Sequence, residues 1–162
     1  MPIRSPIGYI VGLWLCPDSA LTLVLGLPTW IFVATACHEL GHFFVYRLLK
    51  LQCKRMVIFC FVWEQGKGFS VDRERKLLSA SCTCLYDPYV PYRHYCASLL
   101  SGGFICLFLS ILAFWGYCLL GVSSFLGFGI VCAGNALFNL LFPYSTDRLL
   151  LKTIKKEREN TA

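Results

Sequence analysis

The chain alternates long apolar runs with one extended polar section, and this pattern predicts most of its elements. Apolar residues dominate three stretches, at positions 28–50, 97–121 and 125–147. Stretches of this length provide the roughly 20 residues that an α-helix needs to cross a bilayer. Basic residues follow the first run, precede the second and follow the third, as they do on the cytoplasmic flanks of membrane helices. We therefore expect an all-α membrane protein with a three-helix transmembrane core.

Residues 1–27 are apolar as well, but Pro17-Asp18-Ser19 interrupts them. Neither half is long enough to span a membrane alone. The stretch is therefore either an N-terminal membrane segment with a break at the proline, or a re-entrant stretch that returns near Asp18. Both descriptions stay open at the level of sequence.

The polar section, residues 51–92, predicts a small cytoplasmic β-hairpin. Met56–Trp63 is short and rich in aromatic and β-branched residues, which favours a strand. Glu64–Gly68 has turn composition, and Phe69–Val71 can return as a second strand. Asp72–Lys76 is charged and should be solvated. The edge near Met56–Trp63 could pair with an extended substrate, although a purely structural hairpin explains the same residues.

Composition agrees with a membrane location. Hydrophobic residues make up 57% of the 162 positions, more than soluble domains usually contain. The net charge of +6 comes from clustered basic residues, including a tail at 148–162 that we expect in the cytoplasm. No basic face accompanies a soluble fold, so we expect the lipid bilayer and no nucleic acid as a partner. The length indicates one domain, a single integral-membrane unit over residues 1–162.

The ten cysteines do not form the pattern of a disulfide framework. One group lies inside apolar runs, where Cys packs as a small hydrophobe: Cys37, Cys106, Cys118 and Cys132. A second group lies in or beside the section that we expect in the cytoplasm, where thiols stay reduced: Cys53, Cys60, Cys82, Cys84 and Cys96. The CxC spacing in this group, without a second pair, argues against a zinc finger. Cys16 is the one candidate for the outer face.

The first apolar run contains His38-Glu39-Leu40-Gly41-His42, an HExxH pattern. Residues four apart share a helix face, so both imidazoles can bind one metal ion. Glu39 borders that face and can act as a base toward a water on the ion without being a ligand. Ionisable groups are costly inside hydrocarbon unless something binds or pairs them. We therefore expect a zinc site with His38 and His42 as ligands and Glu39 as the catalytic residue.

A catalytic zinc ion usually has three protein ligands and one open position, so a third ligand should lie elsewhere. The segment NLLFPYSTD runs from Asn139 to Asp147. Pro143 disfavours helix for Phe142, so the helix should break there and let Asp147 fold back beside the histidines. Asn139 can then hydrogen-bond freed backbone or an extended peptide. An alternative stays open, in which Asp147 pairs with a neighbouring basic residue and Asn139 packs between helices.

Taken together, the two motifs make residues 28–150 resemble the site-2 proteases, a family of intramembrane zinc metalloproteases. That family carries HExxH on one core transmembrane helix and an N-x-x-P…D-G motif at the end of a later one. The first motif is similar to His38–His42, and the second is similar to Asn139 with Asp147. The resemblance implies a minimal member of the family, without a PDZ-like or nucleotide-sensing domain.

The chain departs from the family pattern at three places. Pro143 comes one residue later than the family proline, and Arg148 stands where Gly usually follows the Asp. Ser101-Gly102-Gly103 is only a loose counterpart of the family's G-P…N segment, although its small residues permit close backbone approach between helices. These departures affect the match to the family at Asn139 more than the match at the expected metal ligands.

The resemblance implies a zinc metalloendopeptidase that cuts within or next to transmembrane segments, in regulated intramembrane proteolysis. Membrane-anchored regulators, signal-peptide remnants and peptide precursors are the expected substrates. The expected location is a bacterial cell membrane, which the chain crosses several times, with the active site toward the cytoplasmic side. His42 lies five residues before Arg47, about 7–8 Å at helical rise, which places the site below the membrane surface.

Two functions of other classes compete with proteolysis. One is a non-catalytic membrane adaptor, and an intact Glu39 argues against it. The other is a metal transporter or sensor that uses the same histidines. Transporters usually carry polar residues along a path through several helices, whereas residues 97–121 contain no ionisable side chain other than Cys and Tyr.

Overall fold

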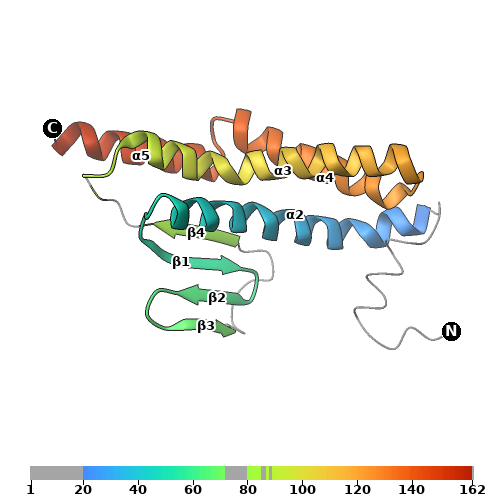
Figure 1. The fold of residues 1–162 in the computed structure, drawn as a ribbon, viewed down its shortest axis with the longest axis horizontal. Coiled ribbons are helices and arrows are strands. Elements are labelled where there is room, and N and C mark those ends of the chain that lie inside the picture. Colours follow the sequence, from blue (N-terminus) through green and yellow to red (C-terminus); the bar gives the residue numbers. More distant parts are fainter. Residues whose placement is uncertain (1–19, 72–79, 85–86, 88, 162) are drawn as a thin grey trace.

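The computed structural model describes residues 20–71, 80–84, 87 and 89–161 of the chain (Figure 1). The prediction for the N-terminal segment therefore falls mostly on residues 1–19, outside the described part, as do those for Cys16 and Asp72–Lys76. The elements follow one another in this order: α2 (Ala20–Leu48), β1 (Cys53–Ile58), β2 (Phe61–Glu64), β3 (Gly68–Val71), β4 (Ala80–Cys84), α3 (Tyr92–Leu120), α4 (Ser123–Leu141) and α5 (Thr146–Thr161).

The expected all-α fold with a three-helix transmembrane core is wrong. The structure combines helices with a four-stranded antiparallel sheet of order β3-β2-β1-β4. Two helical stretches in the described residues are long and apolar enough to cross a membrane, Tyr92–Leu120 and Ser123–Glu159. The fold is therefore mixed. The polar section forms four strands, whereas its sequence pattern predicted two.

The sheet differs from the predicted hairpin in two ways. Met56–Trp63 is two strands and not one, since the backbone turns at Phe59, where φ is 58°, and β1 then pairs with β2. In addition, β4 pairs with the other side of β1. Its residues, Ala80–Cys84, are small or polar and give no strand pattern. Because β1 and β2 lie in the middle, the open edge expected near Met56–Trp63 is instead provided by β3 and β4.

The α3–α4 hairpin closes tightly at Gly121. This glycine has φ of 67°, the left-handed conformation that ends many helices, and its N–H donates to the carbonyl of Tyr117. Between the helices, the Ser110 hydroxyl donates to the Gly129 carbonyl at 3.0 Å. The outer faces of both helices expose large apolar side chains: Phe104, Phe108, Ile111, Trp115, Leu119, Ile130, Leu137 and Leu141.

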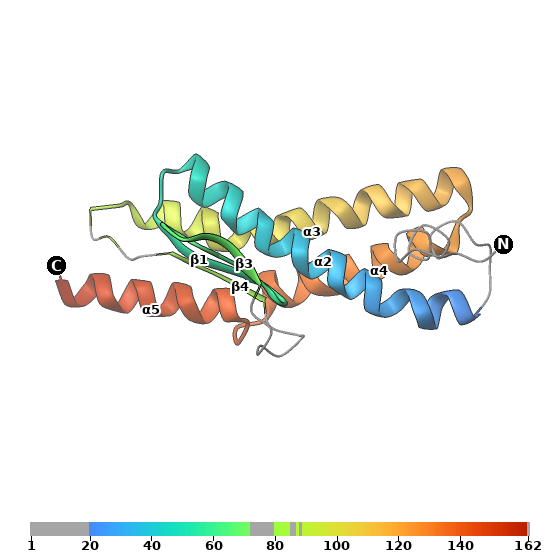
Figure 2. The same ribbon diagram turned by 90° about the horizontal axis from the view of Figure 1, so that it is seen from below.

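A buried apolar cluster attaches the sheet to the helices at one end of the molecule. Tyr46 of α2, Met56 of β1 and Tyr95 of α3 pack there, together with Leu151 and Ile154 of α5. Figures 1 and 2 show the sheet on one side of the helices, next to α2, at the end of the molecule opposite the α3–α4 connection. The charged face of α5 is exposed, so the predicted basic tail is an amphipathic helix. This packing fixes the positions of α2, β4 and α5 relative to one another.

Candidate metal centre

His38 and His42 lie one turn apart near the middle of α2 and face the same way, as their spacing predicted. The Nε2 atoms of the two rings are 3.1 Å apart. Both residues are buried, with only 6% and 2% of their surfaces exposed. The structure thus places two imidazole nitrogens within reach of one ion, in a region shielded from solvent.

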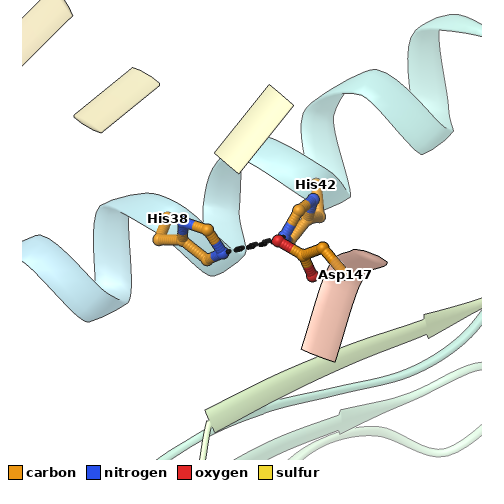
Figure 3. A group of neighbouring side chains, drawn as sticks. All are labelled: His38, His42 and Asp147. Carbon is orange, nitrogen blue, oxygen red and sulfur yellow. Dashed lines mark hydrogen bonds and ion pairs between the residues drawn. The ribbon is translucent and has the colours of Figure 1, made fainter. Parts of the chain in front are cut away.

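Asp147 joins them from the first turn of α5 (Figure 3). Its Oδ2 lies 3.3 Å from Nε2 of His38 and 3.5 Å from Nε2 of His42. Ligand atoms bound tetrahedrally at the zinc distances of about 2.0–2.1 Å lie about 3.3 Å apart. The three separations in the structure therefore match those of three ligands on one tetrahedral ion, and the group could hold a metal ion.

The break after α4 turns Asp147 toward the histidines, as Pro143 predicted. Phe142 is extended, with φ of −76° and ψ of 121°, which is the conformation favoured before proline. The Ser145 hydroxyl donates to the carbonyl of Asn139 at 3.3 Å, and the Arg148 guanidinium donates to the carbonyl of Leu140. These bonds satisfy the last carbonyls of α4 and hold the chain reversal that precedes Asp147.

Helix α3 orients the two rings from behind. Nδ1 of His42 donates to the carbonyl of Ser98 at 2.7 Å, which leaves Nε2 with a free lone pair for a metal. Nδ1 of His38 faces the Cys106 thiol, with 3.9 Å between the nitrogen and Sγ. The sequence had assigned Cys106 to packing alone, and no local pattern pairs Ser98 or Cys106 with a histidine in another helix.

Gly102 lets the backbone of α3 lie directly against the imidazoles. A β-carbon at this position would be 2.7 Å from both Cε1 of His38 and Nε2 of His42. On the facing side, a β-carbon at Gly41 would be 3.2 Å from Cα of Gly102. The small residues expected to permit close approach thus do so at the centre itself.

Two carboxylate oxygens at the centre are unsatisfied. Oε2 of Glu39 and Oδ2 of Asp147 are buried and accept no well-formed hydrogen bond among the described residues, and Oδ2 has only the two imidazole nitrogens beside it. A buried acceptor left in this state costs about 1–3 kcal/mol, and more when it is charged. A cation beside Asp147 and a water beside Glu39 would satisfy both atoms. The residues present therefore fit a bound metal ion.

A cavity of about 350 Å³ opens in front of the centre. Glu39 faces it together with both histidines and Asp147, and one wall is formed by residues 80–83 of β4. Asn139 also lines the cavity, and its Nδ2 donates to Oδ1 of Asn135 at 2.7 Å. The remaining lining residues were not singled out from the sequence: Thr35, Asn135, Thr146 and Leu150.

Comparisons with known proteins return nothing for this chain: no family model, no curated protein and no solved structure matches it.

Proposed function

We propose that the chain is a zinc metalloendopeptidase of the site-2 protease type, which hydrolyses peptide bonds within or next to membrane segments. The observation that carries this proposal is the spacing of 3.1–3.5 Å among Nε2 of His38, Nε2 of His42 and Oδ2 of Asp147. Two of these residues belong to the HExxH motif. The third comes from the segment that the resemblance singles out.

The donor set favours zinc over harder cations. Two imidazoles and one carboxylate form the ligand set of several zinc peptidases, which keep the fourth position for water. Magnesium and calcium bind oxygen ligands almost exclusively. Zinc at this position supplies the Lewis acidity that makes water nucleophilic near neutral pH.

Glu39 is the proton carrier in this proposal. Its Oε2 is buried and unpaired beside the ligands, so it can accept a proton from the attacking water. The oxygen of that water forms the new bond to the peptide carbonyl carbon, and the C–N bond then breaks. Glu39 passes its proton to the leaving nitrogen, which gives a carboxylate and an amine.

The cavity also suggests how the substrate binds. The outer edge of β4 pairs with no other described strand, and β4 forms a wall of the cavity that contains Glu39. A peptide added along this edge would be extended, which is the form that exposes a scissile carbonyl. Asn139, which also lines the cavity, can hydrogen-bond the same peptide.

The α3–α4 hairpin provides the membrane anchor in this proposal. Its exposed aromatic and aliphatic side chains suit contact with lipid, and the two helices bring Tyr92 and Leu141 back to one side. Basic residues flank that side: Arg47, Lys50, Arg93, Arg148 and Lys152. By the positive-inside rule, the sheet and the metal centre then face the cytoplasm of a bacterial cell.

Proteolysis of a model substrate tests the proposal. A single membrane segment with helix-breaking residues near its cytoplasmic end is incubated with the full-length protein in liposomes. We expect cleavage that a chelator abolishes and that added zinc restores. Absence of cleavage, despite bound metal, would favour the transporter or the adaptor.

A further inference from the structure

Strands β1 and β4 bring two cysteine side chains together on the buried face of the sheet. Sγ of Cys53 lies 3.6 Å from Sγ of Cys82, and both residues are buried. Cys53 is paired with Cys84 across the ladder, but the register shifts between Cys53 and Arg55. This irregularity turns the Cys53 side chain toward Cys82, the neighbour on the diagonal.

The pair is close enough to form a disulfide bond. A disulfide requires a sulfur–sulfur distance of about 2.0 Å, so the two atoms need to approach by about 1.6 Å. Rotation about the Cα–Cβ bonds covers part of that distance, and a small shift of β4, the edge strand, covers the rest. Within the sheet, β1 is the only described strand that pairs with β4.

The surroundings of Cys53 favour its thiolate form. The hydrogen bond from the Cys82 thiol lowers the pKa of Cys53, against the effect of burial, and the Arg55 backbone N–H and the nearby Arg47 guanidinium lower it further. A larger thiolate fraction near neutral pH speeds attack on a disulfide.

Cys53 also opens on a cavity that suits an anionic reagent. This cavity has a volume of about 330 Å³, and both Arg47 and Lys50 line it with Cys53. The Arg47 guanidinium is held over the rings of Phe43 and Trp63, 5.6 Å and 5.9 Å from their centroids. Two cations beside one thiol favour a disulfide that carries carboxylates.

We propose that Cys53 and Cys82 form an oxidisable dithiol that reacts with anionic low-molecular-mass disulfides, the class to which oxidised glutathione belongs. The Cys53 thiolate attacks one sulfur of the reagent, and the first small thiolate leaves. Cys82, deprotonated, then attacks Sγ of Cys53, and the second small thiolate leaves. The two protein protons end on the two small thiols, so one disulfide is reduced as one is formed.

The new bond would act on the metal centre through β4. Cys82 lines the cavity of that centre, whereas Cys53 lines the other cavity. A movement of β4 toward β1 would change the shape of the cavity wall that β4 forms. We propose that the substrate binds along this wall. This consequence rests on the proposed peptidase function, but the thiol chemistry does not.

The test reads the bond directly and needs no substrate. Reduced full-length protein in detergent is incubated with oxidised glutathione, free thiols are alkylated, and the protein is digested with trypsin. Trypsin releases Cys53 in the peptide Leu51–Lys54, and it releases Cys82 with Cys84 in Leu77–Arg93. We expect these two peptides to be joined, and fragmentation to place the bond at Cys82.

Three variants and one neutral reagent sharpen the result. Cys82→Ser should stop the reaction at a glutathione adduct on Cys53, whereas the matched variant Cys84→Ser should still form the bond. Arg47→Gln should slow the reaction with oxidised glutathione about three- to tenfold, but leave that with uncharged hydroxyethyl disulfide unchanged. A bond to Cys84, or wild-type protein whose Cys53 and Cys82 both remain alkylatable, would overturn the proposal. The test of the Cys53–Cys82 bond does not depend on whether the chain cleaves peptides.

Discussion

A β-carbon on Gly102 would lie 2.7 Å from Nε2 of His42, the atom that faces Asp147. This contact joins the backbone of α3 to the metal centre without any polar group. Because Gly102 has no side chain, it allows α3 to pack closely against α2, the helix that carries the HExxH motif. The same contact means that a single methyl group at Gly102 would overlap both imidazoles.

We predict that Gly102→Ala weakens metal binding. The added methyl group overlaps both imidazoles, so the rings must rotate or α3 must move away from α2. Changes in the residues that orient metal ligands typically reduce affinity about 10- to 100-fold. The affinity is measured by competition with a chromophoric chelator. Gly134→Ala is the matched control, because a β-carbon there meets nothing within 4 Å, and it should leave the affinity unchanged.

Replacement of Glu39 by Gln should separate catalysis from metal binding. The amide keeps the size of the side chain but cannot accept the proton of the attacking water. We expect kcat to fall by a factor of about 10² to 10⁴, the range that general acid–base catalysis contributes, with unchanged metal content. Cleavage at the wild-type rate would remove Glu39 from the mechanism.

Backbone methylation of the substrate tests the edge of β4. Successive residues of an added strand point their N–H groups alternately toward and away from the edge. Methylation of an inward N–H removes one hydrogen bond of about 0.5–1.5 kcal/mol. A scan of single N-methyl groups should therefore lower kcat/KM about two- to tenfold at every second position. A scan with no such alternation would argue against strand addition.

The membrane arrangement can be checked with one epitope at two places. Because α3 and α4 form a hairpin, its connection at Gly121 should lie outside the cell and the end of α5 inside. An epitope inserted after Gly121 should bind antibody on intact spheroplasts. The same epitope appended after Ala162 should bind only after permeabilisation. Equal exposure at the two places would contradict the topology.

The sequence predicted the residues of the centre better than it predicted the fold. HExxH places two histidines on one helix face because the helical period is local, and Pro143 fixes a break for the same reason. The position of Asp147 beside the histidines was open from sequence, since an interfacial ion pair explained the same residues. The structure brings Asp147 within 3.5 Å of both rings, although its role as a ligand stays a prediction.

The parts that sequence missed depend on contacts between distant segments. Ala80–Cys84 has no apolar alternation, and it becomes a strand only because β1 offers an unpaired edge. The contacts of His42 with the Ser98 carbonyl and of His38 with Cys106 join α2 to α3 through groups that carry no motif. An all-α fold was the natural expectation from the apolar runs, and the four-stranded sheet, which the pairing of β4 with β1 completes, makes it wrong.

Metal analysis of the purified protein tests the central claim most directly. We compare the full-length wild type with the variants His38→Ala, Asp147→Ala and Glu39→Gln. Each protein is loaded with zinc and dialysed, and its zinc content is measured by elemental mass spectrometry. We predict about one zinc per chain in the wild type and in Glu39→Gln, and little or none in the other two. Wild type without metal, or Asp147→Ala with a full zinc content, would contradict the account.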